Sequence, residues 1–206
     1  NSKIEWNRIK YILKNIDKKK IISLDTRKSD IMEKGINSGV KLINDVSGLN
    51  YDKNSIYVLK KYKTPFVLQH SLGNPDVMQN NPKYKNVLLD IYDFFEEKIK
   101  FLRRAGINHN NIILDPGIGF GKSVSHNFKL IKYLNKFCDY GCPVLIGPSR
   151  KSFLGITLDL PVEDRFEGTS AVVTAGILNG AKIVRVHNVR RIRRVAIIAD
   201  RIRSTI

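Results

Sequence analysis

The stretch that decides the fold is Ile112–Lys122, with the sequence IILDPGIGFGK. Three apolar residues lead to a carboxylate, Asp115, and Pro116 then ends strand pairing because proline has no backbone N–H to donate. Three glycines follow before Lys122, and glycine permits positive φ and close approach of a ligand to the backbone. We therefore predict a buried strand that ends at an acid, followed by a loop that bends back over the strand end.

The same arrangement, an apolar run followed by polar residues, recurs along the chain. It predicts strands over 21–24, 40–43, 66–68, 112–114, 144–146 and 182–184. Apolar residues at helical spacing predict helices between them, over 3–19, from Ser29 or Asp30 to Gly39, and over 54–62, 88–102, 128–134, 163–179 and 192–202. Alternating units of this kind, with strands that are continuous apolar runs, predict a parallel α/β fold.

Polar residues gather at the carboxyl end of every predicted strand, where parallel α/β folds place their active sites. An open doubly wound sheet concentrates its site at one switch point, whereas a barrel draws on every strand, so the even distribution favours a TIM (β/α)8 barrel. Such a barrel has eight units and typically about 250 residues. This chain of 206 residues contains six predicted units. We expect one barrel domain over residues 1–206 that lacks the first two strands.

The net charge of +17, from 36 basic and 19 acidic residues, is the unusual feature of the composition. It has three interpretations: a solvated lysine-rich surface, a small substrate that carries phosphate, or nucleic acid. The basic residues are spread along the chain without a recognised nucleic-acid-binding motif, so nucleic acid is the least favoured.

No apolar run approaches the ~20 residues of a membrane helix, and the first ten residues contain no secretory core. We therefore expect a cytoplasmic protein, or an organellar one if the source is eukaryotic. Cys138 and Cys142 have no further cysteine or histidine pattern nearby, which favours two reduced thiols over a zinc site.

If the strands lie side by side, one cavity collects the polar residues that follow them, namely Asp25, Asn44, Asp115, Lys151, Arg185 and His187. A carboxylate pairs bidentately with a heterocycle that presents adjacent N–H donors. Lysine, arginine and histidine near the rim suit a pyrophosphate or a carboxylate. The set therefore predicts a ligand with a flat, donor-rich ring and a phosphorylated tail.

Other interpretations stay open for some of these residues. Asp25 and Asn44 could instead cap the helices that follow their strands. The glycine-rich turn lacks the Walker spacing, because Lys122-Ser123 is not preceded by GxxxxG. His70 could be structural or a ligand, and His109 and His126 are expected at the surface. Turn signals predict a mobile loop over residues 71–82.

Five motifs together resemble the dihydropteroate synthase family. They are LDTRKSD, LINDVSG, ILDPGIGFGK, GPSRKSF and IVRVHNV, in this order and spacing, and the resemblance runs from about Ile21 to the C-terminus. Members of this family are TIM barrels that join 6-hydroxymethyl-dihydropterin diphosphate to p-aminobenzoate in folate synthesis, and they are sulfonamide targets. The resemblance implies a transferase with Mg²⁺ as cofactor and a homodimer as assembly.

The resemblance also implies roles for individual residues. The pterin ring would be held by Asp25, Asn44, Asp115, Lys151 and Arg185. Asp115, Lys151 and Arg185 would be the catalytic residues, Arg185 and His187 would bind the diphosphate, and Ser152 and Phe120 would border p-aminobenzoate.

Some features depart from the family pattern. The asparagine that binds the metal in the family is absent from this sequence, so no residue here is assigned to the metal, and the activity of this chain is an open question. Gln69 stands where a methionine is usual, and Leu72 lies in a loop that is often more polar. Two alternatives remain: a pterin-binding methyltransferase domain, which does not need SRKSF or RVH, and a non-catalytic basic binding protein on the same fold.

The last predicted helix carries an apolar stripe of Ile192, Val195, Ile198 and Ile202. We expect this stripe to pack against the barrel, and part of it could meet a second subunit.

Overall fold

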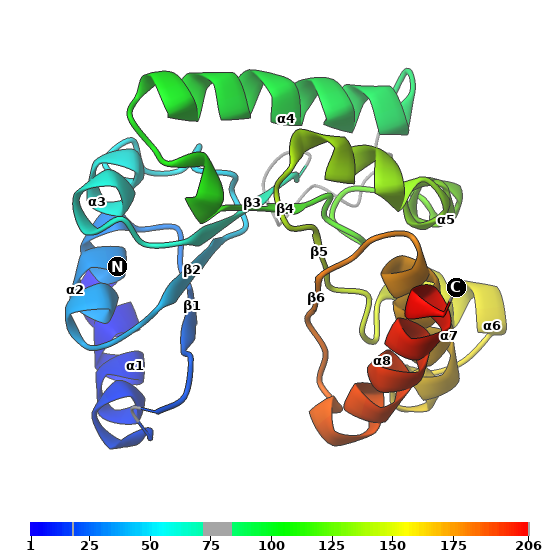
Figure 1. Ribbon diagram of the computed structural model, residues 1–206. Coiled ribbons are helices and arrows are strands. Elements are labelled where there is room, and N and C mark those ends of the chain that lie inside the picture. Colours follow the sequence, from blue (N-terminus) through cyan, green and yellow to red (C-terminus); the bar gives the residue numbers. More distant parts are fainter. Residues whose placement is uncertain (18, 72–83, 206) are drawn as a thin grey trace. The chain divides into compact units, whose positions relative to one another are not determined.

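The computed structural model describes residues 1–17, 19–71 and 84–205. Within these residues, six short strands alternate with helices (Figure 1). The strands are β1 (Ser23–Asp25), β2 (Leu42–Asp45), β3 (Phe66–Gln69), β4 (Ile112–Asp115), β5 (Leu145–Ile146) and β6 (Ile183–Val184). The α-helices are α1 (Ser2–Asn15), α2 (Ser29–Asn37), α3 (Ser55–Tyr62), α4 (Val87–Arg104), α5 (Val124–Lys132), α6 (Ser152–Leu158), α7 (Phe166–Leu178) and α8 (Val189–Ser204). Three 3₁₀ helices are η1 (His109–Asn111), η2 (Leu134–Tyr140) and η3 (Val162–Asp164).

By its internal contacts the chain divides into two compact units, and the first comprises Asn1–Gln69 and Glu97–Ile113. In this unit β1, β2 and β3 are parallel neighbours, with Asp25 opposite Asn44 in the register. The sheet order is β1-β2-β3-β4, and the first two residues of β4 belong to this unit. Helix α2 packs between α1 and α3 beside these strands (Figure 1). Ile43, Phe66 and Leu68 are fully buried, as continuous apolar strands predict.

The second unit comprises His70–Glu96 and Leu114–Ile206. Its strands are also parallel: Leu114 bridges to Val144, and β5 pairs with β6. Helices α7 and α8 pack closely on each other (Figure 1). Their shared core consists of Val173, Ile177, Ile192 and Ala199. The expectation of a single domain over residues 1–206 stays a prediction.

The start of α2 differs from the sequence prediction. Lys28 is the N-cap residue and makes no side-chain capping bond, so neither Ser29 nor Asp30 caps the helix. Instead, the backbone N–H of Ser29 donates to Oδ2 of Asp52 over 2.8 Å. A carboxylate distant in sequence thus satisfies one of the free N–H groups of the first turn. The helix ends before Gly39, as predicted, and Gly39 has a φ of +100°.

Helix α6 was not predicted, because its seven residues directly follow the polar end of a strand.

The prediction that the apolar stripe of α8 packs against the rest of the domain is correct for only half of its residues. Ile192 belongs to the core shared with α7 and Val195 packs against that core, whereas Ile198 and Ile202 are 61% and 56% exposed. The loop expected over 71–82 lies almost wholly outside the described residues, and so does Leu72.

Within the described part of the chain, no helix combines the length and the apolar character needed to cross a membrane.

Candidate active site

The second unit builds its polar centre around Asp115, the last residue of β4. This side chain is 1% exposed. Its Oδ1 accepts a 2.8 Å bond from the N–H of Gly117, and its Oδ2 lies 3.5 Å from Nη2 of Arg185. Burial raises the pKa of the Asp115 carboxyl, while Arg185 and the Gly117 N–H act in the opposite direction. The carboxylate is therefore buried and is held by a small number of directed contacts.

Gly147 allows Arg185 to reach this carboxylate. Arg185 follows β6, and β5 is the neighbour of β6 in the sheet. A Cβ atom on Gly147, the residue after β5, would lie 3.1 Å from Nη2 of Arg185 and 3.3 Å from its Nε. The guanidinium therefore lies directly on a backbone position that has no side chain, and a larger residue there would crowd the ion pair.

The glycine-rich loop after Asp115 has positive φ at two glycines whose surroundings leave no room for a side chain. Gly117 has a φ of +73° and its Cβ position is occupied by the carbonyl of His70. Gly119 has a φ of +82°, and a Cβ there would lie 2.7 Å from Cδ of Lys151. Both the conformation and the close approach therefore require glycine.

Lys151 extends its half-buried side chain over this loop. Its Nζ lies 3.9 Å from the ring centroid of Phe120, a cation–π contact. Burial lowers the pKa of the Lys151 ammonium, the charge of Arg185 lowers it further, and Asp115 opposes both. Ser152 is exposed and is the first residue of α6. The structure thus places Asp115, Phe120, Lys151 and Arg185 in one connected group.

His187 is held by the loop that carries Lys151. Its Nδ1 lies 2.9 Å from Oγ of Ser149, and its backbone N–H donates to the same Oγ over 3.4 Å. His187 is exposed. With Arg185 two residues earlier, the strand end presents two donors to an anionic group.

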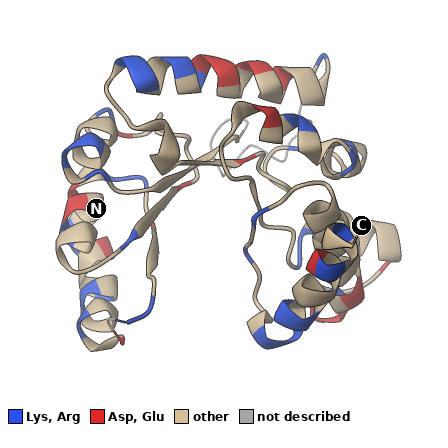
Figure 2. Cartoon of the chain, in the orientation of Figure 1, with Lys and Arg blue, Asp and Glu red and all other residues tan. Residues whose placement is uncertain are grey.

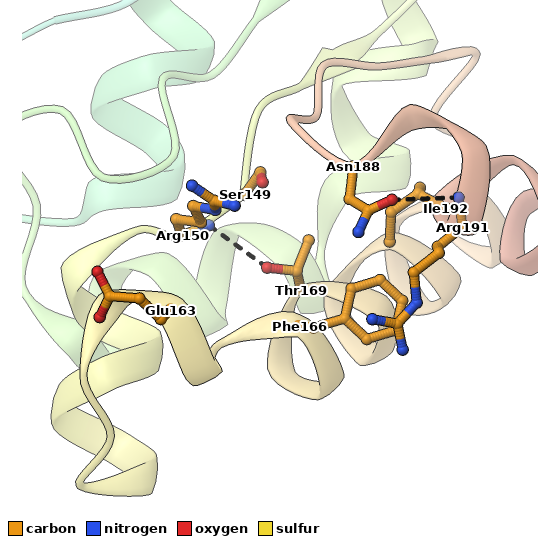
Figure 3. Close-up of a pocket in the computed structure, with 8 residues that line it drawn as sticks. All are labelled: Ser149, Arg150, Glu163, Phe166, Thr169, Asn188, Arg191 and Ile192. Carbon is orange, nitrogen blue, oxygen red and sulfur yellow. Dashed lines mark hydrogen bonds between the residues drawn. The ribbon is translucent and has the colours of Figure 1, made fainter.

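A small pocket of about 80 Å³ lies beside Ser149 (Figure 3). It is lined by Ser149, Arg150, Glu163, Phe166, Thr169, Asn188, Arg191 and Ile192. The Arg191 guanidinium stacks 3.6 Å from the Phe166 ring centroid. The backbone N–H of Arg150 donates to Oγ1 of Thr169 over 3.4 Å, which fixes the turn between β5 and α6.

Two predicted residues, Asp25 and Asn44, lie in the first unit. They are register partners at the carboxyl ends of β1 and β2, with Asp25 exposed and Asn44 3% exposed. The structure therefore brings these two together at one edge of the sheet. Neither is the N-cap of the helix that follows its strand, since Lys28 and Asn54 hold those positions. The alternative of helix capping is wrong for both.

Sequence reasoning missed Lys122 as a structural part of the site. It is 5% exposed, and its Nζ donates to the carbonyl of Phe120 over 2.8 Å and lies 3.3 Å from Nδ1 of His70. Burial lowers the pKa of Lys122 to about 7, and burial together with the charge of Lys122 lowers the pKa of His70 to about 3. Lysine is rarely buried, so the loop sequence alone did not reveal this contact.

The remaining histidines and cysteines have simpler roles. His126 forms a capping box with Ser123 at the start of α5, and His109 lies half-buried in η1. Both side chains are half-buried, so the surface positions predicted for them are only partly correct. Cys138 and Cys142 are free thiols, as predicted.

Comparison with known proteins shows which family has this arrangement. The family model described as "Pterin binding enzyme" matches residues 1–187. A dihydropteroate synthase of Haemophilus influenzae is 43% identical over 168 residues, which are 82% of this chain and 61% of that protein. Two solved structures are also similar. A Clostridium difficile dihydropteroate synthase studied in the presence of pteroic acid has a TM-score of 0.90 and 35% identity, over 100% of this chain and 76% of that one.

A Yersinia pestis dihydropteroate synthase in complex with a sulfonamide drug has a TM-score of 0.89 and 33% identity, over 95% of this chain and 70% of that one. The predicted α/β fold of the pterin-binding barrels is thereby confirmed over the part that the chain covers. The chain spans about 60% of the length of the curated relatives it matches.

Proposed function

The chain belongs to the pterin-binding enzyme family, and from this premise we propose that its protein is a dihydropteroate synthase. The reaction joins 6-hydroxymethyl-7,8-dihydropterin diphosphate to p-aminobenzoate and gives 7,8-dihydropteroate and pyrophosphate. The observation that carries the proposal is the buried Asp115 carboxylate with Arg185 3.5 Å away. The similarity to dihydropteroate synthases supports it, although the chain spans only about 60% of such relatives.

Asp115 suits the pterin ring because a carboxylate accepts two parallel N–H bonds from the amino-pyrimidine edge of such a ring. Burial excludes water, so these bonds would be stronger than at the surface. Lys151 would donate to an acceptor atom of the ring, and Arg185 would stack on the ring face. By the family resemblance, Asp25 and Asn44 also bind the pterin.

Arg185 and His187 are proposed to bind the diphosphate. As the bond between the pterin methylene carbon and the diphosphate oxygen breaks, negative charge grows on the departing pyrophosphate. Fixed donors aimed at that charge stabilise the transition state. The amino nitrogen of p-aminobenzoate attacks the methylene carbon and loses a proton to solvent, so no strong base is needed.

Phe120 and Ser152 are proposed to border the p-aminobenzoate site. The Phe120 ring is already fixed under the Lys151 ammonium, 3.9 Å from it. An aromatic edge and an exposed hydroxyl suit a flat aryl amine that carries a carboxylate.

Mg²⁺ is the cofactor that the resemblance implies. The described residues contain no group of three or more His, Cys, Asp or Glu side chains that could hold a metal ion. They do not by themselves supply a metal site, and we therefore assign no step of the reaction to the metal.

Titration calorimetry with 6-hydroxymethyl-7,8-dihydropterin, which lacks the diphosphate, tests the proposal. Asp115→Asn should abolish binding, because the amide replaces one acceptor oxygen with a donor. The control is Asp139→Asn, since Asp139 is an exposed residue of η2. Equal affinity in the protein and the Asp115 variant would contradict the assignment of Asp115, and absence of binding by the unmutated protein would contradict the proposed function.

Homodimer formation and a cytoplasmic location belong to the same proposal. The exposed side chains of Ile198 and Ile202 on α8 support a subunit contact, because isoleucines on a helix surface gain stability when a partner covers them. The two alternative functions, a pterin-binding methyltransferase domain and a non-catalytic binding protein, gain no comparable support from the site.

A further inference from the structure

Lys122 is the most deeply buried lysine among the side chains of the candidate site, and the catalytic steps above do not use it. Its side chain makes two contacts, with the carbonyl of Phe120 at 2.8 Å and with Nδ1 of His70 at 3.3 Å. A buried ammonium is costly unless hydrogen bonds compensate it. These two contacts therefore offset the cost of burying the Lys122 ammonium.

The contact with His70 fixes the protonation pattern of the imidazole. While Lys122 is protonated its ammonium only donates, so in that state Nδ1 accepts and the ring proton lies on Nε2. His70 is in turn joined to the end of β4, because its backbone N–H donates to the carbonyl of Asp115 over 2.9 Å. The loop that leaves the sheet at Asp115 is thus joined back to the same strand end through Lys122 and His70.

Two further side chains hold the loop from outside. The N–H of Gly119 donates to Oδ1 of Asn127 over 2.7 Å, and the hydroxyl of Tyr84 donates to the carbonyl of Gly121 over 3.1 Å. Phe120 lies between these two anchored glycines, and its carbonyl is the one that Lys122 holds. With the backbone held at these points, the Cα–Cβ bond of Phe120 has a set direction, and its ring meets the Lys151 ammonium.

We infer that Lys122 is a positioning residue that sets the place of the Phe120 ring and thereby the fit of the aryl amine substrate. This inference rests on the proposed function for the identity of the substrate, but not for the effect on Phe120. The expected consequence is selective: Lys122 should affect p-aminobenzoate more than the pterin, because Phe120 is the residue that it holds.

Fluorine NMR of the protein labelled with 4-fluorophenylalanine tests the positional effect without any ligand. Phe120→Leu identifies the Phe120 resonance. Lys122→Met, which keeps an unbranched side chain one atom shorter and removes the charge and the donors, should shift that resonance. The matched control is Lys136→Met, since Lys136 is an exposed residue of η2. An unchanged Phe120 resonance in Lys122→Met would overturn the inference.

Steady-state kinetics tests the selective consequence. Lys122→Met should raise the KM for p-aminobenzoate about tenfold, which corresponds to about 1.4 kcal/mol of lost contact with the displaced ring, and change the KM for the pterin diphosphate by less than about threefold. Equal increases in both KM values would overturn the inference. An unmutated protein without transferase activity would contradict the proposed function and leave the fluorine result as the test of the inference.

If Lys122→Met does not fold, Lys122→Gln replaces it. Its amide can still donate to the Phe120 carbonyl but carries no charge. We expect this variant to shift the Phe120 resonance from its position in the unmutated protein and to raise the KM for p-aminobenzoate by less than about tenfold. A shift and a KM indistinguishable from those of the unmutated protein would overturn the inference.

Discussion

His70 is a histidine that folding keeps neutral. Its side chain is buried, its ring packs edge-on against Phe94 with 5.0 Å between the centroids, and Lys122 lies 3.3 Å from its Nδ1. Burial and that neighbouring charge lower the pKa of His70 to about 3. The sequence left open whether His70 has a structural role or binds a ligand. The structure supports the structural role, in which His70 accepts a hydrogen bond from Lys122.

This lowered pKa predicts how stability depends on pH. The unfolded chain protonates His70 near its ordinary pKa of about 6.5, whereas the folded protein resists protonation down to about pH 3. Between these values the unfolded state binds more protons, so the free energy of unfolding falls as pH falls. From pH 6.5 to 4.5 the loss due to His70 should be about 2 kcal/mol.

Urea unfolding at several pH values between 4.5 and 7 measures this effect. His70→Gln cannot be protonated, so its unfolding free energy should fall less steeply on acidification than that of the unmutated protein. His109→Gln, in the half-buried η1 helix, is the control. Parallel curves for the protein and His70→Gln would show that this histidine is not held neutral.

At the scale of elements, Arg165 joins α6 to the turn that carries Lys151. Its Nη1 donates to the carbonyl of Arg150 over 3.1 Å, and its Nε donates to the carbonyl of Leu160 over 3.2 Å. The guanidinium occupies the place where a Cβ atom on Gly155 would lie. Gly155 is within α6, where glycine costs about 1 kcal/mol relative to alanine. Contact with Arg165 therefore explains why a helix contains glycine here.

This explanation predicts that the effect of Gly155→Ala on the free energy of unfolding changes sign when Arg165 is removed. In the unmutated protein, Gly155→Ala should lower the free energy of unfolding by about 1–2 kcal/mol, because it displaces Arg165 from two carbonyls. In an Arg165→Ala background the same substitution should raise it by about 0.5–1 kcal/mol through helix propensity. Chemical unfolding of the two single variants and the double variant gives both values. The same sign in both backgrounds would refute the role of Arg165.

The residues at which strands end were the most predictable feature of the fold. Apolar runs that stop at a polar residue located the end of β4 at Asp115 and the residues Arg185 and His187 just beyond β6, because a buried strand tolerates polar groups only where it leaves the core. Contacts between segments distant in sequence were not predictable. The cap of α2 comes from Asp52, and the loop after β4 depends on Lys122 and His70, which are 52 residues apart. Neither contact is marked by a motif in the neighbouring sequence, so neither could be predicted from it.

At the scale of the whole molecule, the positive charge lies on many helices of both units rather than in one region (Figure 2). Helix α8 is the most basic of them at its start, with arginines at positions 190, 191, 193 and 194. Interleaved with its arginines, α8 exposes isoleucines. The interpretation of the charge as a solvated surface or as attraction for anionic substrates stays a prediction, whereas the isoleucines allow a direct test of assembly.

Ile198 and Ile202 are 61% and 56% exposed and are not part of the core that α8 shares with α7. If the protein is a homodimer through this helix, Ile198→Glu with Ile202→Glu should convert it to a monomer, because a partner would bury both charges without compensation. Its midpoint of chemical unfolding at low protein concentration should change little, since both side chains are exposed in the single chain.

Sedimentation velocity over a range of concentrations gives the oligomeric state. Ile4→Glu is the matched control, because Ile4 is a similarly exposed isoleucine, 55%, on α1 of the first unit. A dimer that persists in the double variant would exclude this face of α8 as the subunit contact. A dimer lost equally in the Ile4 variant would mean that added negative charge, rather than the isoleucines of α8, disturbs association.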